Sequence, residues 1–241
     1  MASMRIVGGG RAGGSFETAL CESGHDVVEV LHRGDDVSRA ARGVDAVLLA
    51  VPDRFVKDIA RAITAQSSTA VIHLSGSLGL DVLATHERRA SLHPLVTLPD
   101  RVIGAMRLRG AFFAVAGDQV ATDVALSLGG HPIVVRDEDR PTYHAAACIA
   151  ANHLVGLLGQ VQRVAGEIGL PLEAFLPLAQ GALDDVRMLG PELALTGPAA
   201  RGDCPIIERD RAALSEAERD GYDAGVALAA RLTVSGTRKW R

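Results

Sequence analysis

The chain has 241 residues, of which 48% are hydrophobic, 22% are charged and 3% are aromatic. Its formal net charge of −4 argues against a nucleic-acid partner, and the lack of an unbroken apolar run of about 18 residues predicts no membrane span. Three widely separated cysteines, Cys21, Cys148 and Cys204, exclude a disulfide framework and a zinc spacing, and they favour a cytoplasmic location.

The chain opens with a strand, a helix and a second strand. Residues 4–7 and 26–31 are apolar runs typical of strands, and residues 15–23 between them favour a helix. Together they form a unit of about 30 residues, the size in which the turn after the first strand holds a dinucleotide.

That turn carries glycines in the spacing G-x-G-x-x-G, as Gly8, Gly10 and Gly13. We expect Gly8 to allow a tight turn, Gly10 to let backbone approach a diphosphate, and Gly13 to let helix and strand pack closely. The positive end of the helix dipole then faces the phosphates. A glycine-rich turn without a ligand is the alternative.

The end of the second strand indicates which cofactor binds. A carboxylate that would hold the ribose 2′-hydroxyl of NAD is missing there, and His32 and Arg33 follow the strand instead. A guanidinium binds a phosphate well, so Arg33 favours NADPH over NADH. Alternatively, Arg33 is an ordinary solvated charge, and Asp35 or Asp36 contacts the ribose.

Strands and helices continue to alternate up to about residue 135, which predicts a doubly wound, mainly parallel α/β sheet. The expected strands are residues 46–51, 70–74, 90–93, 111–116 and 132–135, and the expected helices are residues 53–63 and 118–128. Asp53 is the expected N-cap of the first of these helices.

After residue 138 no strand is expected. We predict a long helix over residues 143–168, a second over 172–189, a turn-rich segment at 195–203, and two closing helices within 206–232. The chain therefore divides into a Rossmann dinucleotide-binding domain, residues 1–138, and a small all-α domain, residues 139–241.

Ligands of open α/β sheets bind beyond the carboxyl ends of the strands. This rule selects residues 51–53 after the third strand (Val51, Pro52 and Asp53), residues 75–77 after the fourth, and His93 and Pro94 after the fifth. All three segments are expected near the nicotinamide end of the cofactor. Ser75 can bind substrate or cofactor, or cap the next turn. His93, before Pro94, can act as an acid, hold a carboxylate or be purely structural.

The second domain offers further polar candidates. His144, Cys148 and Asn152 are spaced by four residues, so a regular helix places them on one face. This polar stripe can close over the nicotinamide or can form interhelical hydrogen bonds. Arg201 can anchor a substrate carboxylate, and Asp203 is expected to cap the next helix.

Several short segments together carry a resemblance to a known family. The chain resembles Rossmann-like proteins with a C-terminal DUF2520 domain, and it is similar to ketopantoate reductases, pyrroline-5-carboxylate reductases and the wider 6-phosphogluconate dehydrogenase-like group. The segments are the glycine motif, residues 49–53, 73–76, 91–95 and 143–146, Asn152 and residues 196–203.

The ketopantoate reductase motif Lys-x-x-x-Asn-x-x-x-Asn falls on residues 144, 148 and 152. Asn152 matches, but His144 replaces the lysine that donates a proton in that family, and Cys148 replaces the first asparagine. The departure argues against ketopantoate as substrate. The resemblance also implies a homodimer, and apolar helices in a small second domain are consistent with one.

The resulting hypothesis is an NADPH-dependent oxidoreductase that transfers a hydride to a small carbonyl or imine bearing a carboxylate. His144 is the candidate proton donor, Asn152 orients the substrate, and Ser75, His93 and Arg201 contact it. Two alternatives are a non-catalytic NADP(H)-binding sensor and a dehydrogenase of a prephenate-like acid. The expected cofactor contacts are Gly8, Gly10, Arg11, Ala12, Gly13, His32, Arg33, Val51, Pro52, Asp53 and Ser75.

Overall fold

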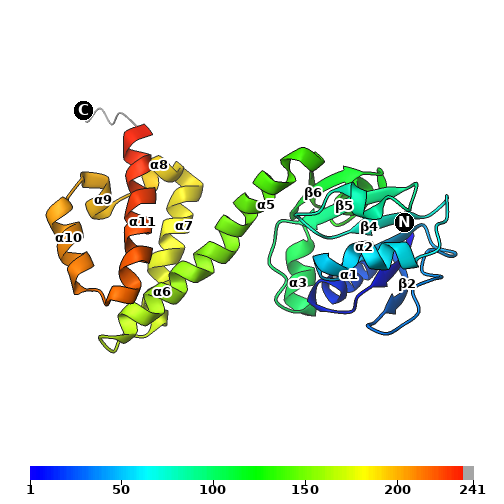
Figure 1. The fold of residues 1–241 in the computed structure, drawn as a ribbon, viewed down its shortest axis with the longest axis horizontal. Helices are drawn as coiled ribbons and strands as arrows, with labels where there is room; N and C mark the ends of the chain where they lie inside the picture. Colours follow the sequence, from blue (N-terminus) through cyan, green and yellow to red (C-terminus); the bar gives the residue numbers. More distant parts are fainter. Residues whose placement is uncertain (236–241) are drawn as a thin grey trace. The chain divides into compact units, whose positions relative to one another are not determined.

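The computed structural model describes residues 1–235 and divides into two compact units, Met1–Ile149 and Ala150–Arg241. The first unit combines a sheet with helices, and the second is built from helices (Figure 1). The sequence placed its domain boundary at residue 138, just after the last strand. The compact units instead divide within the helical segment that follows.

The first unit contains one seven-stranded sheet in the order β2-β1-β3-β4-β5-β6-β7. The five strands from β2 to β5 are parallel, β6 runs antiparallel to β5, and β7 is parallel to β6. The carboxyl ends of the five parallel strands therefore lie at one edge. The strands are β1 (Ser3–Val7), β2 (Asp26–Leu31), β3 (Ala46–Leu49), β4 (Ala70–His73), β5 (Arg89–Pro94), β6 (Phe112–Gly117) and β7 (His131–Val134).

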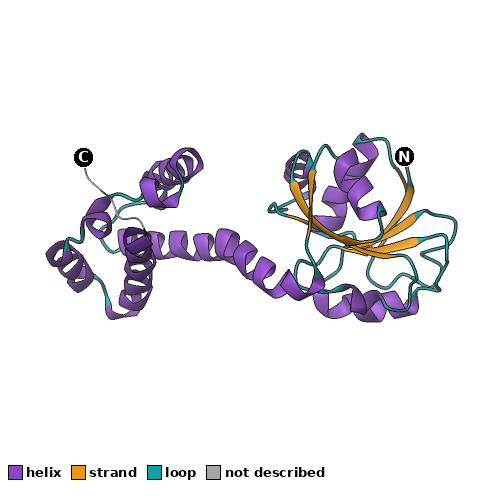
Figure 2. Cartoon of the chain, turned by 90° about the horizontal axis from the view of Figure 1, so that it is seen from above, coloured by secondary structure: helices purple, strands orange, loops and turns teal. Residues whose placement is uncertain are grey.

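Helices cover both faces of this sheet (Figure 2). Both faces of the sheet are apolar, so each is covered by a layer of helices. In β3, alternate residues point to opposite faces: Ala46 and Leu48 belong to one buried apolar cluster, and Val47 and Leu49 belong to another. The first cluster packs under α1 (Arg11–Glu22), α3 (Arg101–Leu108) and α4 (Val120–Ser127), and the second under α2 (Asp53–Ala62) and the short turn η1 (Leu80–Leu83).

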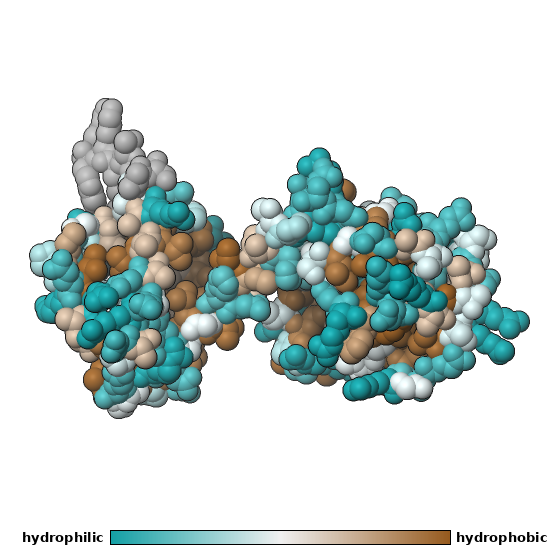
Figure 3. All heavy atoms as spheres, in the orientation of Figure 1, coloured by the Kyte–Doolittle hydropathy of each residue, from teal (hydrophilic) through white to brown (hydrophobic). Residues whose placement is uncertain are grey.

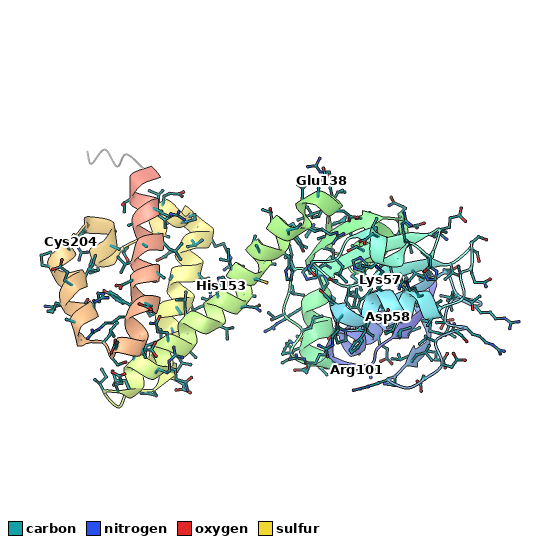
Figure 4. The ribbon with its side chains drawn as sticks, viewed as in Figure 1. Lys57, Asp58, Arg101, Glu138, His153 and Cys204 are labelled. Atoms are coloured by element: carbon teal, nitrogen blue, oxygen red, sulfur yellow. The ribbon has the colours of Figure 1, made fainter. Side chains whose placement is uncertain are left out.

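The sequence did not predict α3. Asp100 begins this helix, because its carboxylate accepts hydrogen bonds from the backbone N–H groups of Val102 and Ile103, both at 2.8 Å. Arg101, labelled in Figure 4, joins α3 to α1 by donating from Nε to the Thr18 hydroxyl at 2.8 Å.

The long helix expected over residues 143–168 is not one regular α-helix. It begins earlier, as α5 (Arg140–Cys148) after the turn η2 (Asp137–Asp139), and a π-helical turn, η3 (Ile149–His153), separates α5 from α6 (Leu154–Gly166). His153, labelled in Figure 4, closes this turn. The wider π turn changes the helical phase, so Asn152 does not continue the stripe of His144 and Cys148.

The remaining helices belong to the second unit, where α6 and α11 are joined by a two-point ion pair between Arg163 and Glu218. The segment expected to be turn-rich contains the short helix α9. The elements are η4 (Leu172–Ala174), α7 (Leu176–Leu189), α8 (Pro191–Ala194), α9 (Gly197–Arg201), α10 (Cys204–Ala213) and α11 (Glu216–Ser235).

One helical segment among residues 1–235, Asp137–Gly166, is long and apolar enough to cross a membrane by length and composition, since an 18-residue window within it has a mean hydropathy of 1.2. No membrane span was expected from the sequence, since this segment contains no unbroken apolar run of about 18 residues. Alanine and leucine keep the average high across the intervening polar residues. A core helix of a soluble protein passes the same test.

Candidate functional site

The turn between β1 and α1 is tightly packed on one side and open on the other. Gly8 has a φ of +107°, and a Cβ there would overlap the carbonyl oxygen of Ala50. A Cβ on Gly13 would overlap the carbonyl oxygen of Gly8. By contrast, a Cβ on Gly10 would meet no heavy atom within 4 Å. Open space therefore borders the backbone at the position where the motif expects a diphosphate.

Helix α1 provides the electrostatics of an anion site. Gly10 precedes its first residue without a side-chain cap, and no acidic residue lies in the first turn. The backbone N–H groups of Arg11, Ala12 and Gly13 belong to the first turn, which has no intrahelical acceptors. The 12-residue helix thus presents free donors and an uncompensated positive dipole beside the open space. These features fit the diphosphate of a dinucleotide.

The loop after β2 leaves Arg33 available. The carboxylate of Asp35 accepts from the backbone N–H of His32 at 2.7 Å. Asp36 accepts from the backbone and hydroxyl of Ser38, which lowers the pKa of Asp36 below its usual value. Both acids therefore stabilise their own loop. Arg33 is exposed and forms no hydrogen bond or ion pair with any residue in the range 1–235.

The ring of His32 packs so closely on Gly9 that a Cβ at position 9 would overlap the ring. The imidazole thus lies beside the glycine turn, where the sequence expected a cofactor contact.

The ends of β3 and β4 are joined through Asp53, which was expected to cap α2. Pro52 occupies the cap position instead, and the Asp53 carboxylate accepts from the hydroxyls of Ser75 and Ser77, both at 2.7 Å. The Ser75 hydroxyl accepts from the backbone N–H groups of Ser77 and Leu78 at 3.1 Å. Ser75 therefore caps its own turn while it links two strand ends. Val51 is half-buried before this junction.

His93, at the end of β5, is hydrogen-bonded to a residue from α5. The distance between its Nδ1 and the Tyr143 hydroxyl is 2.6 Å, and the two rings meet edge to face. On its other side the imidazole packs against Gly76, where a Cβ would lie 2.8 Å from the His93 Cε1. A residue larger than glycine at position 76 would therefore displace the ring.

A buried guanidinium contributes to the electrostatics of this region. Arg140, at the start of α5, is completely buried, and it donates from Nε to Asp137 at 3.0 Å while its Nη1 and Nη2 have no hydrogen-bond partner among the described residues. Burial, the nearby His144 and the Arg140 charge lower the pKa of His93 to about 4. The imidazole is therefore neutral at pH 7.

His73 is buried one strand away, in register with Ser91. Burial and the Arg140 charge lower its pKa to about 4, although Asp53, the Gly79 backbone and Asp137 act in the opposite direction. Its two ring nitrogens have no hydrogen-bond partner among the described residues. Burial also raises the pKa of Tyr143 to about 12, against the effect of Arg140.

The structure brings together only part of the expected helix face. His144 and Cys148 are neighbours, with 3.8 Å between the sulfur and the ring nitrogens. Asn152 lies on the π turn in the second unit and is exposed. Within residues 1–235, no group of three or more His, Cys, Asp and Glu side chains is placed to hold a metal ion.

Arg201 is the last residue of α9 and is exposed, so its guanidinium is accessible to an anion within the second unit. Asp203 precedes α10, as expected, but its carboxylate forms no capping hydrogen bond. Asp203 thus occupies the expected N-cap position without the expected side-chain hydrogen bond.

Comparison with known protein families identifies one domain. Residues 112–228 match the family model described as Domain of unknown function (DUF2520). The match begins in β6 and ends in α11, so it includes His144, Asn152 and Arg201. It confirms the resemblance predicted from the sequence motifs. No curated protein matches the chain in sequence.

Solved structures confirm the predicted fold, a Rossmann sheet followed by helices. A Thermotoga maritima protein is 23% identical with a TM-score of 0.73, and the match covers 96% of this chain and 98% of that one. A provisionally assigned NADP oxidoreductase of Bacteroides fragilis is 17% identical with a TM-score of 0.77, covering 95% and 98%. Plasmodium falciparum pyrroline carboxylate reductase with NADP bound is 12% identical with a TM-score of 0.62, covering 96% and 98%.

Two residues near the edge of the sheet had no expected role. Tyr143 was noted only as part of a motif, and Arg140 was not considered. Ser77 was selected with the strand ends, but its hydrogen bond to Asp53 was not expected. The sequence gives no signal that Tyr143 lies against His93, because 50 residues separate them.

Proposed function

We propose that the chain is an NADPH-dependent reductase of a small carbonyl or imine that bears a carboxylate. The open space beside Gly10, at the uncompensated N-terminus of α1, is the observation that carries the cofactor assignment. The Plasmodium falciparum reductase that shares this fold has NADP bound, which supports the same choice.

Residues along the sheet edge fit successive parts of the cofactor. In this proposal the Arg33 guanidinium binds the ribose 2′-phosphate, and His32 flanks the ribose. The amides of Arg11, Ala12 and Gly13 hold the diphosphate. The Val51–Pro52 segment and the Ser75 hydroxyl, fixed by Asp53, border the nicotinamide. When bound, reduced nicotinamide supplies a hydride.

The substrate is expected next to the last of these strand ends, beside His93. Tyr143 and His144 from α5 are the groups on that side that can donate a proton. The sequence analysis predicted His144 as the proton donor to the substrate. Asn152 and Arg201 are proposed to orient the substrate and hold its carboxylate. Because His93 is neutral at pH 7, it contacts substrate through hydrogen bonds rather than as a cation.

Calorimetry with the apo protein tests the cofactor assignment. We expect NADPH to bind at least tenfold more tightly than NADH. Arg33→Ala should weaken NADPH binding by about ten- to a hundredfold and leave NADH binding unchanged, since a hydrogen bond to a charged group contributes about 1.5–3 kcal/mol. Arg39→Ala removes the same charge from the same loop and serves as the control. Equal affinity of wild type for both coenzymes would contradict the NADPH assignment.

Turnover over a panel of 2-oxo acids and cyclic imines tests the reaction. Oxidation of NADPH by any of them, abolished in Gly10→Ala through loss of cofactor binding, supports the reductase. Tight NADPH binding without turnover would favour a non-catalytic NADP(H) sensor, which the replacement of the family lysine by His144 also favours.

We also propose that the protein forms a homodimer through its second unit. The helix α7 has no buried residue, and Leu178 and Met188 are 74% and 71% exposed. Apolar side chains gather at the surface of this region (Figure 3). An identical surface on a second copy can cover them symmetrically.

A further inference from the structure

Two side chains from different elements form a hydrogen-bonded pair beyond the proposed nicotinamide site. His93 lies at the carboxyl end of β5, next to the Ser75–Ser77 turn through its contact with Gly76. Tyr143 reaches it from α5 with a hydroxyl-to-Nδ1 distance of 2.6 Å. Neither ring is fully buried, so both can meet a ligand at this edge. Among the described residues, by comparison, the ring nitrogens of His144 have one polar contact, with the sulfur of Cys148 at 3.8 Å.

This geometry points to Tyr143 as the catalytic acid that protonates the reduced substrate, with His93 as the residue that positions it. The inference rests on the proposed reductase function and replaces His144 as the proton donor. It assigns the Nδ1–H tautomer to His93, which then donates to the Tyr143 oxygen and leaves the phenol hydrogen free to point at a substrate.

The proton balance of the step follows from these contacts. As hydride arrives from the reduced nicotinamide, the carbonyl or imine carbon gains a C–H bond, and its π electrons move to oxygen or nitrogen. The Tyr143 O–H bond breaks while a new O–H or N–H bond forms. The phenolate that remains accepts a hydrogen bond from His93 Nδ1 and then takes a proton from water.

Charges around the pair favour this arrangement. Burial raises the pKa of Tyr143 to about 12, and the positive charge of Arg140 opposes that rise by stabilising the phenolate. The Nη1 and Nη2 atoms of Arg140 have no hydrogen-bond partner among the described residues. Arg140 and His144 oppose protonation of His93, while Asp53 favours it. A neutral imidazole retains a single ring proton, so it can donate to tyrosine without becoming a competing acid.

The hydrogen bond can be tested without cofactor. The chain has two tyrosines, Tyr143 and Tyr222. Protein made with 3-fluorotyrosine in a Tyr222→Phe background therefore gives one fluorine resonance, which reports ionisation of residue 143. His93→Phe should raise the midpoint of that titration by about one pH unit, because the phenolate loses a donor. His93→Asn, which retains a side-chain N–H, should keep the midpoint near that of the parent.

Circular dichroism confirms that each variant is folded before it is titrated. If the midpoint stays unchanged or falls in His93→Phe while His93→Asn behaves like the parent, His93 does not donate to the phenolate, and the inference is overturned. A rise of equal size in both variants also contradicts it, since the effect would then come from altered packing.

Kinetics of the intact protein test the catalytic role. Tyr143→Phe should lower kcat by about 10²- to 10⁴-fold, the usual range for losing a general acid, and leave the Kd for NADPH within twofold. Tyr222→Phe should leave both unchanged. His93→Asn should retain most of the kcat that His93→Phe loses.

The two proposals fail in different ways. A larger loss of kcat in His144→Ala than in Tyr143→Phe would overturn the role of Tyr143 and leave the reductase assignment intact. Failure of the wild-type protein to bind NADPH by calorimetry would overturn the reductase, whatever the fluorine titration shows.

Discussion

In the first unit, apolar side chains are buried on both faces of the sheet, with Phe16 and Phe113 fully enclosed. In the second unit, among residues 150–233, Ala165 is the one apolar residue that is buried. A sheet covered on two sides provides its own core. The helices of the second unit expose many of their leucines and provide no comparable core. Their apolar surface is better explained by association with a partner.

The largest expected effect tests whether that partner is a second copy. Lysine at Leu178 and Met188 together should weaken self-association by about 30-fold or more, since each change places a charge in the centre of the proposed interface. Light scattering and sedimentation equilibrium measure the association.

Lysine at Val102 and Leu126 is the matched control in the first unit. These residues are 65% and 56% exposed, so they resemble the α7 pair in accessibility, and their replacement should leave association unchanged. If the wild-type protein is monomeric at micromolar concentration, dimerisation does not explain the exposed leucines of α7.

The next prediction compares glycines of the two units. Gly13→Ala should lower the free energy of unfolding by about 1–3 kcal/mol, because its methyl group overlaps the Gly8 carbonyl oxygen. Gly181→Ala lies within α7, where a Cβ meets nothing within 4 Å. It should raise stability by about 0.5–1 kcal/mol through helix propensity. Urea denaturation of both variants checks the contrast, which fails if Gly13→Ala is as stable as wild type.

The glycine turn and the parallel strands were predictable from sequence because their signals are local. A buried parallel strand is a continuous apolar run, and β2 was predicted with its observed bounds of Asp26–Leu31. Helix α3 was missed because two of the three residues on its buried face, Gly104 and Ala105, are small, and Leu108 is the third. A Cβ on Gly104 would overlap the Ser15 hydroxyl, so close packing on α1 replaces the usual leucine stripe.

Site residues were predictable only where the sequence signal lies within a single segment. Strand ends indicated Asp53, Ser75 and His93, but not the hydrogen bonds that join Asp53 to Ser75 and His93 to Tyr143. Both bonds depend on where separate elements pack. The π turn at residues 149–153 also has no sequence signal, and it separates Asn152 from the stripe that regular spacing predicted.

Acid should destabilise the first unit through His73. Its pKa falls from 6.5 in the unfolded chain to about 4 in the native one. Between these values the unfolded state binds more protons, so stability decreases as pH falls from 6.5 towards 4. From pH 7 to 5.5 this histidine should contribute a loss of about 1 kcal/mol. Urea denaturation at the two pH values should show a smaller loss in His73→Leu, and an equal loss in both proteins would contradict the assignment.

The smallest effect concerns ion pairs, where the two units should behave alike. Arg88 binds Asp118 at two points in the first unit, and Arg163 binds Glu218 at two points in the second. One partner of each pair remains accessible to solvent, so Arg88→Gln and Arg163→Gln should each lower stability by about 1 kcal/mol or less. Added salt should reduce both effects. A much larger loss in Arg163→Gln would mean that electrostatics, rather than a covering partner, compensates for the missing core of the second unit.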